Sequence, residues 1–160
     1  MARVGALRIA GYSDPFERRR SERYRALSEP QPTLEQQRSF VDWLRPLVGR
    51  IDVVLVHSPA LAELAAEELR ANPPPEPLAI LTGHTHVADL ATSENLVELN
   101  GGTVGGGGTG NLEKAQPFGL AVLVYEARPR FEPLAADLVE IDPRAGSARA
   151  ERRQLSVTAP

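Results

Sequence analysis

Two short apolar runs on either side of a helical segment constrain the fold of this chain more than any other feature. The runs are residues 52–57 and 78–82, and the segment 59–71 between them has the apolar spacing of a helix. A strand–helix–strand unit of this kind pairs its strands in parallel through a right-handed crossover. Because parallel strands end at the same edge of a sheet, the residues that follow the two runs are predicted to converge there.

All three histidines of the chain lie at the ends of these two runs. His57 ends the first run, and the block Gly83-His84-Thr85-His86 follows the second. Neutral imidazole binds zinc, iron and other borderline divalent metals, and is a poor ligand for magnesium or calcium. We therefore expect His57, His84 and His86 to form a metal site at one edge of the sheet.

The N-terminal part of the chain predicts one strand and one helix. The strand is expected over residues 4–10, with a turn over 11–15. The helix begins at Thr33, which forms a capping box with Gln36, and Pro46 limits its length. One apolar stripe of this helix is expected to face the core and consists of Leu34, Val41, Leu44 and Val48.

Capping residues and Pro or Gly turns also mark the boundaries of the second helix and of the C-terminal strands. Ser58 is predicted to cap the second helix, with Pro59 in the first helical position. After the histidines, short apolar runs separated by Pro and Gly turns predict strands, the last three of them in an antiparallel meander. The expected strands cover residues 95–99, 118–125, 135–141 and 148–156. Residues 1–156 are long enough to form one α/β domain, and residues 157–160 are expected to fray.

Two stretches each leave two interpretations open. Residues 16–27 carry five arginines and two glutamates, which is typical of a solvated helix or loop and also fits a basic lid over an anionic substrate. The glycine-rich stretch 100–110 either lines a phosphate cavity with backbone amides or is a flexible connection between strands. We expect residues 100–103 beside the site and residues 105–110 in a mobile hairpin.

Composition excludes several classes of protein. The absence of cysteine excludes disulfides, thiolate metal sites and a cysteine nucleophile. A net charge of −3 is too small to indicate a nucleic-acid partner. The longest apolar run, residues 120–125, is far shorter than the ~20 residues that span a bilayer, and the first residues lack a signal-peptide layout. We expect a cytoplasmic location, and a membrane anchor only as part of a longer parent chain.

The histidine motifs resemble the C-terminal half of the calcineurin-like metallophosphoesterases. In that family a histidine ends one strand, a Gly-His-X-His block ends the next, and an Asn-X-Gly-Ser/Thr loop follows. The corresponding stretches here are Val56-His57-Ser58-Pro59, Leu81-Thr82-Gly83-His84-Thr85-His86 and Leu99-Asn100-Gly101-Gly102-Thr103-Val104-Gly105, together with the turn Gly11-Tyr12-Ser13-Asp14-Pro15.

The resemblance implies part of a four-layer α/β/β/α sandwich with mixed sheets, and a site for two divalent ions of Mn, Fe or Zn. Such a site hydrolyses phosphate mono- or diesters with a metal-bound hydroxide. By position, His57 and His84 would bind one metal and His86 the other. The residues expected near the metals or the phosphate-ester substrate are Asp14, Ser58, Gly83, Thr85, Asn100, Gly101 and Thr103.

This sequence departs from the family because it lacks the first three motifs, Asp-X-His, Gly-Asp and Asn-His. These supply the bridging aspartate, an asparagine ligand and the histidine that acts on the substrate, so no catalytic residue is assigned in this chain. Asp14 is either a turn former before Pro15 or a substitute ligand, whereas Asp52 begins its strand at the opposite edge. We expect half a domain, with an apolar sheet face for the missing half or another chain to cover.

Three functions are compatible with the sequence. The first is a metallophosphoesterase to which this chain contributes ligands without being active alone. The second is a non-catalytic module that binds a metal or a partner. The third is a purely structural zinc site with three histidine ligands.

Overall fold

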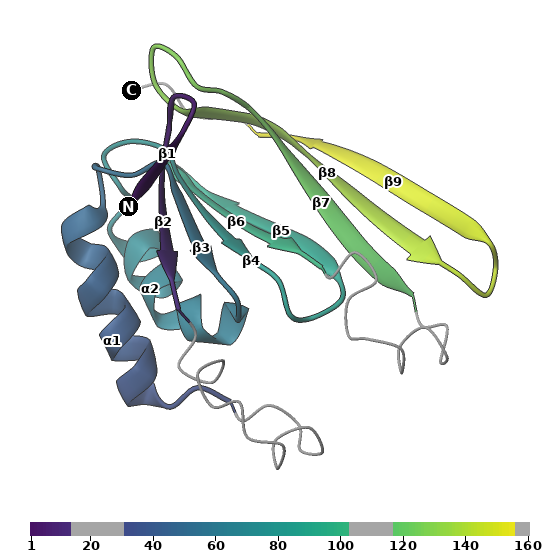
Figure 1. Ribbon diagram of the computed structural model, residues 1–160, viewed down its shortest axis with the longest axis horizontal. Coiled ribbons are helices and arrows are strands. Elements are labelled where there is room, and N and C mark those ends of the chain that lie inside the picture. Colours follow the sequence, from purple (N-terminus) through teal and green to yellow (C-terminus); the bar gives the residue numbers. More distant parts are fainter. Residues whose placement is uncertain (14–30, 103–116, 156–160) are drawn as a thin grey trace.

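The computed structural model describes residues 1–13, 31–102 and 117–155 (Figure 1). Its elements are β1 (Ala2–Val4), β2 (Leu7–Tyr12), α1 (Leu34–Leu44), the 3₁₀ helix η2 (Arg45–Leu47), β3 (Val53–Val56), α2 (Pro59–Ala71), β4 (Leu78–Thr82), β5 (Ala88–Ser93), β6 (Leu96–Gly101), β7 (Phe118–Glu126), β8 (Glu132–Asp142) and β9 (Ser147–Gln154). They form a six-stranded mixed sheet in the order β1-β2-β3-β4-β6-β5 and a three-stranded antiparallel sheet in the order β7-β8-β9.

The described elements are stacked in three layers (Figure 1). Helices α1 and α2 cover one face of the six-stranded sheet, and the three-stranded sheet covers the other. One core cluster, which includes Phe40, Leu61 and Ile80, fills the space under the helices. A second, which includes Val97 and Phe131, lies between the sheets. The predicted α/β class is confirmed, whereas the four-layer sandwich is not, because within the described residues no helix covers the outer face of the second sheet.

The predicted strand–helix–strand unit is confirmed and forms the centre of the first sheet. Strands β3 and β4 pair in parallel with Val54 opposite Ile80, and α2 crosses between them. Strand β3 also pairs in parallel with β2, so it is an interior strand. Its apolar residues are needed on both faces: Val54 packs under the helices, and Val53 packs between the sheets.

Helix α1 begins at the predicted capping box. The Gln36 backbone nitrogen donates to Thr33 Oγ1 at 3.3 Å, and the Thr33 backbone nitrogen donates to Gln36 Oε1 at 2.8 Å. The predicted apolar stripe is wrong at Leu34, which lies in the first turn and is 53% exposed, because the buried face begins at Phe40. Phe40 packs against Trp43 with ring centroids 5.7 Å apart. Neither helix of the described residues has the length and apolar character that a bilayer crossing requires.

Two predictions for the N-terminal strand are wrong. Residues 4–10 do not form one strand, because Gly5 adopts a φ of 61° and turns the chain. The result is an antiparallel hairpin of β1 and β2 with Val4 opposite Leu7. The turn predicted over residues 11–15 starts too early, since β2 continues to Tyr12.

Strand β5 is an element that the sequence pattern did not predict. Its residues 88–93 include two alanines and an aspartate, which are residue types depleted in strands. The strand forms because a turn at Glu94, with a φ of 45°, folds it back on β6. The hairpin places β6 beside β4 in parallel and leaves β5 as the edge strand.

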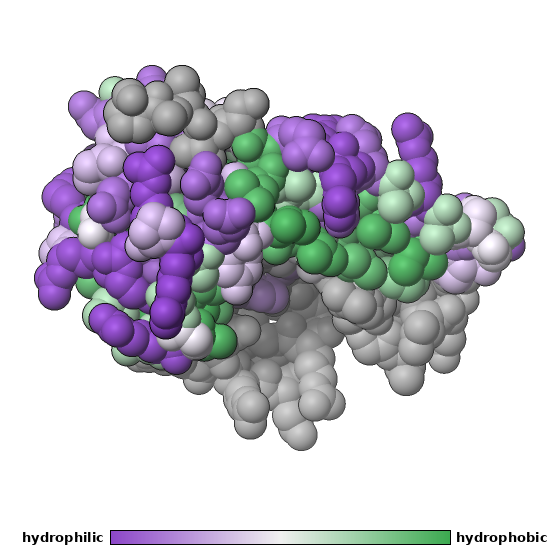
Figure 2. All heavy atoms as spheres, turned by 90° about the horizontal axis from the view of Figure 1, so that it is seen from above, coloured by the Kyte–Doolittle hydropathy of each residue, from purple (hydrophilic) through white to green (hydrophobic). Residues whose placement is uncertain are grey.

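The predicted C-terminal meander is confirmed, and part of its outer face is apolar. Strands β7, β8 and β9 pair antiparallel in sequence order. Leu120 lies opposite Val139, and Val122, which is 47% exposed, lies opposite Asp137. Figure 2 shows hydrophobic surface gathered over this side of the molecule. That a missing half-domain or another chain covers this face stays a prediction.

An ion pair with a buried carboxylate joins β2 to the start of β3, at the sheet edge away from the histidines. Asp52 is 4% exposed and accepts hydrogen bonds from Arg8 Nη2 and the Arg8 backbone nitrogen, both at 2.6 Å. The Asp52 hydrogen bond raises the pKa of Arg8. The backbone of Asp52 also bonds to Arg8 and Ala79 on the two neighbouring strands. Asp52 is therefore a structural residue, as its position in the sequence predicts.

Replacing Asp52 should destabilise the fold strongly. We expect Asp52→Ala to lower the free energy of unfolding by about 3 kcal/mol, because it leaves Arg8 and the Arg8 backbone nitrogen without their acceptor. Urea denaturation followed by circular dichroism measures the change. The matched control is Asp42→Ala, which breaks an exposed pair with Arg45 and should cost less than about 1 kcal/mol. Equal losses in the two variants would contradict the structural role of Asp52.

The Asp137–Arg152 pair on the outer sheet face should make stability depend on pH. Arg152 donates to both carboxylate oxygens at 2.6 and 2.7 Å and holds the pKa of Asp137 below its ordinary value. The pair therefore stabilises the folded state above the unfolded pKa of about 4, and this contribution is lost as the pH falls through the folded pKa. Asp137→Asn should be less stable than the parent at neutral pH, with a difference that shrinks on acidification. Arg152→Gln should show the same pH dependence. If the free energy of unfolding, measured by urea denaturation at several pH values, changes in parallel for the parent and both variants, the expectation is refuted.

Candidate metal centre

The site lies where β3 and β4 end side by side. Strand β3 ends at Val56, directly before His57, and β4 ends at Thr82, two residues before His84. The Gly83 backbone nitrogen donates to the His57 carbonyl oxygen at 3.0 Å. This bond continues the parallel ladder past the strand ends. It fixes the backbones of both histidines next to each other.

The structure brings the His57 and His84 side chains into direct contact. His57 Nε2 lies 3.1 Å from His84 Nδ1. The ring centroids are 5.0 Å apart, and the ring planes are inclined at 70°. The pair therefore presents two ring nitrogens to one small volume at the strand ends, as the sequence predicts.

This separation is compatible with two chemical arrangements. One nitrogen can donate a hydrogen bond to the other if the two rings carry suitable tautomers. Alternatively, both nitrogens can bind one cation: ligand bonds of about 2.0–2.1 Å at angles between octahedral and tetrahedral place two nitrogens roughly 3 Å apart. The two imidazole nitrogens thus fit part of the ligand set of a zinc-like divalent ion.

The backbone around the histidine block is strained. His84 has a φ of 74° and His86 a φ of 63°, which is the left-handed region that residues other than glycine adopt infrequently. Such conformations cost roughly 1–3 kcal/mol each and cluster at functional sites. Local hydrogen bonds maintain them, since the Thr85 nitrogen donates to the Gly83 oxygen at 2.9 Å. The strain at both histidines supports a functional role for the block.

Thr85 and Asn100 hold the histidine block against the end of β6. Asn100 Nδ2 donates to Thr85 Oγ1 at 2.6 Å, and Asn100 Oδ1 accepts from the Gly102 nitrogen at 3.0 Å. Thr85 Oγ1 also donates to the Val87 carbonyl oxygen at 3.2 Å. Both side chains were predicted near the metals or the substrate, and their contacts in this structure are those of positioning residues.

Two glycines let the second sheet approach the histidine block closely. The Gly119 nitrogen donates to the His86 carbonyl oxygen at 2.8 Å, and Gly102 forms a bridge with Leu120 of β7. A Cβ atom at Gly119 would collide with the Ala88 backbone, and one at Gly102 would collide with the Gly119 backbone. Sequence reasoning missed Gly119, although a glycine inside a strand signals such a close backbone approach.

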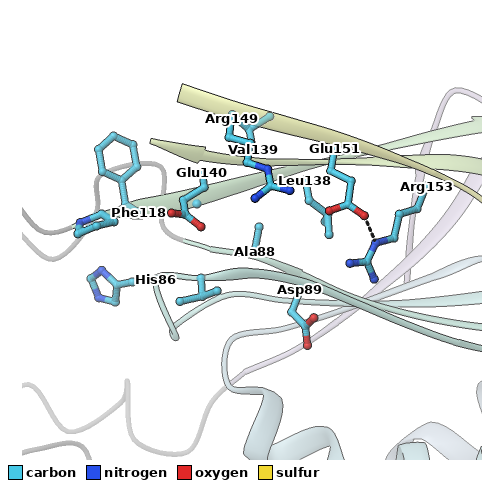
Figure 3. Close-up of a pocket in the computed structure, with 13 residues that line it drawn as sticks. His86, Ala88, Asp89, Phe118, Leu138, Val139, Glu140, Arg149, Glu151 and Arg153 are labelled. Carbon is cyan, nitrogen blue, oxygen red and sulfur yellow. Dashed lines mark hydrogen bonds and ion pairs between the residues drawn. The ribbon is translucent and has the colours of Figure 1, made fainter. Parts of the chain in front are cut away.

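His86 lines a neighbouring cavity of about 430 Å³ between β5 and the second sheet (Figure 3). The described residues that line this cavity do not include His57 or His84. Residues 1–13, 31–102 and 117–155 contain no cluster of three His, Asp or Glu side chains suited to one cation. The structure therefore unites His57 with His84, and the binding of a second metal by His86 stays a prediction.

Some of the other predicted site residues lie within the described part of the chain, and the rest lie outside it. Ser58 occupies the N-cap position of α2, but its side chain makes no capping hydrogen bond; Pro59 follows in the first turn. Gly83 and Gly101 lie at the ends of β4 and β6, beside the histidine block. Asp14 and Thr103 lie outside the described residues, as do the arginine-rich stretch 16–27 and the glycine-rich residues 105–110.

The chain was compared with protein families, curated proteins and solved structures. No protein-family model, no curated protein and no solved structure matches the chain. The resemblance to the calcineurin-like metallophosphoesterases therefore rests on the motif residues around His57 and on the Gly83-His84-Thr85-His86 block.

Proposed function

We propose that this chain is part of a metal-dependent phosphoesterase and supplies imidazole ligands to its metal centre. His57 and His84 bind one divalent ion, and His86 binds a second. The observation that carries the proposal is the 3.1 Å approach of His57 Nε2 to His84 Nδ1. This approach occurs at the carboxyl ends of two adjacent parallel strands, where α/β sheets bind their ligands.

The chemistry follows from the ligand set and its surroundings. A pair of Mn, Fe or Zn ions polarises a phosphate ester and supplies a hydroxide at neutral pH. The residues of this chain hold the ions and keep the histidine block in its strained conformation through the Thr85–Asn100 hydrogen bond. The Gly102 amide already donates to Asn100, which makes this part of the glycine-rich stretch structural rather than phosphate-binding.

The centre needs carboxylates that the described residues do not provide at this point. A dinuclear site holds its two ions with a bridging carboxylate, and leaving-group protonation needs a positioned acid. Asp14 or a second polypeptide segment must contribute these groups for activity. The apolar outer face of the second sheet offers such a segment a surface to cover.

The alternative function is a non-catalytic module that binds a metal or a partner. The apolar patch around Leu120, Val122 and Val139, of which Val122 is exposed, favours this alternative, because exposed apolar patches mark protein contacts. A structural zinc site with three histidines would be a special case of it. Metal affinity and turnover separate the candidates.

Metal binding should depend on His57 and His84 together. We expect zinc titration by calorimetry to show an ion whose affinity falls at least tenfold in both His57→Ala and His84→Ala, since each variant removes one ligand of the same ion. His86→Ala serves as the matched control and should leave this ion in place. Unchanged zinc affinity in His84→Ala would refute the metal centre and identify the 3.1 Å contact as a hydrogen bond between the rings.

The purified chain alone should have little or no phosphoesterase activity. Groups that act as a unit fail together when some are missing, and losing them costs orders of magnitude in rate. The assay uses aryl phosphate mono- and diesters with manganese added. Manganese-dependent turnover that is abolished in His84→Ala would contradict this prediction and would mean that Asp14 or a second copy completes the centre.

A further inference from the structure

Strand β5 lies at one edge of the six-stranded sheet. Within the described residues it is the last strand of the six-stranded sheet and pairs with β6 alone. Its residues Ala88 and Asp89 line the 430 Å³ cavity beside His86. An edge strand carries a row of backbone N–H and C=O groups that another strand can pair with.

The second sheet extends past this edge and forms a roof over the space beside β5. Strand β6 packs against β7, and β5 packs against both β7 and β8. Strand β9 lies one strand further out, and all eight of its residues are exposed (Figure 1). Strand β9 is one strand beyond β8, and neighbouring strands lie about 4.8 Å apart in every sheet. One strand added beside β5 would therefore lie beneath β9.

The roof is charged, and its signs alternate. Arg149, Glu151 and Arg153 of β9 occupy every second position and point into the cavity (Figure 3). Arg153 Nε bonds to Glu151 Oε1 at 2.9 Å. Among the residues that the structure describes, Arg149 forms no ion pair, although Glu140 lies opposite it on β8. An occupant therefore meets a positive, a negative and a positive side chain in sequence on β9, while Glu140 of β8 and Asp89 of β5 also line the cavity.

We propose that the edge of β5 beneath β9 is a docking site for an extended peptide of a partner protein, which joins the first sheet as a further strand. Backbone hydrogen bonds to β5 supply the affinity, and alternate side chains supply the specificity. On the side of the peptide that faces β9, alternate residues are acidic, basic and acidic. These charges are complementary to those of Arg149, Glu151 and Arg153. This docking does not depend on a bound metal.

A second copy of the chain does not fit this site. Strand β5 of a partner copy would bring its own covering strand β8, which would occupy the place of β9 in the first copy. An isolated extended segment has no such cover. The site therefore selects a peptide strand rather than another folded sheet.

The test uses the full chain and two synthetic seven-residue peptides. The matching peptide is Thr-Glu-Thr-Lys-Thr-Glu-Thr, and the reversed peptide exchanges Glu and Lys. NMR titration of the amide signals should show binding of the matching peptide with the largest shifts in β5, and at least tenfold weaker binding of the reversed one. A matching peptide methylated on alternate backbone nitrogens, which cannot donate to β5, should not bind.

Charge-reversal variants then locate the contact. Arg149→Glu should weaken the matching peptide at least tenfold and strengthen the reversed one, whereas the control Arg130→Glu, in the turn between β7 and β8, should change neither. Three results would each overturn the proposal: no shift in β5 with the matching peptide, binding that is insensitive to Arg149→Glu, or a chain that dimerises through β5 without peptide, as measured by light scattering. Unchanged amide spectra outside the site verify that the variants are folded.

Discussion

Parallel pairing of β3 with β4 is the constraint on which the rest of this structure depends. It sets Val54 opposite Ile80, and the Gly83–His57 hydrogen bond extends the same ladder beyond the strands. The His57 and His84 rings meet because their backbones leave the sheet at the same level. Asp52 secures the other end of β3 through Arg8. The Arg8–Asp52 ion pair and the His57–His84 pair thus lie at the two ends of one interior strand.

The two faces of the first sheet impose different demands on the chain. The helices need apolar stripes only on their inner sides, where Phe40 and Leu61 are among the buried residues. The second sheet must come much closer at the histidine end, where β7 meets the start of β5. Only glycine fits at positions 102 and 119 in this arrangement. The hydrogen bond from the Gly119 nitrogen to the His86 oxygen makes the second sheet part of the framework that positions the histidine block.

The metal centre proposed at the strand ends would be incomplete within the described residues. Two imidazoles lie at ligand spacing, and the block that carries His84 and His86 is held in a strained conformation. Strain of this kind persists only where the surrounding structure maintains it, and here Thr85 and Asn100 do so. Groups that would neutralise two cations are absent from this part of the described chain. Within the described residues, the outer face of β7–β9 and the charged strand β9 are the two surfaces proposed to bind other polypeptides.

The sequence alone determined the central strand–helix–strand unit, the capping box of α1, the C-terminal meander and the meeting of His57 with His84. These features depend on local periodicity and on strand connectivity, which a sequence carries directly. Tertiary structure decided the rest. Strand β5 forms from residues with weak strand preference because β6 offers it a hydrogen-bonding edge, and Leu34 stays exposed because the buried face of its helix begins at Phe40. His86 faces its own cavity because Gly119 draws the second sheet against the histidine block, and contacts between segments so distant in the chain leave no periodic signal.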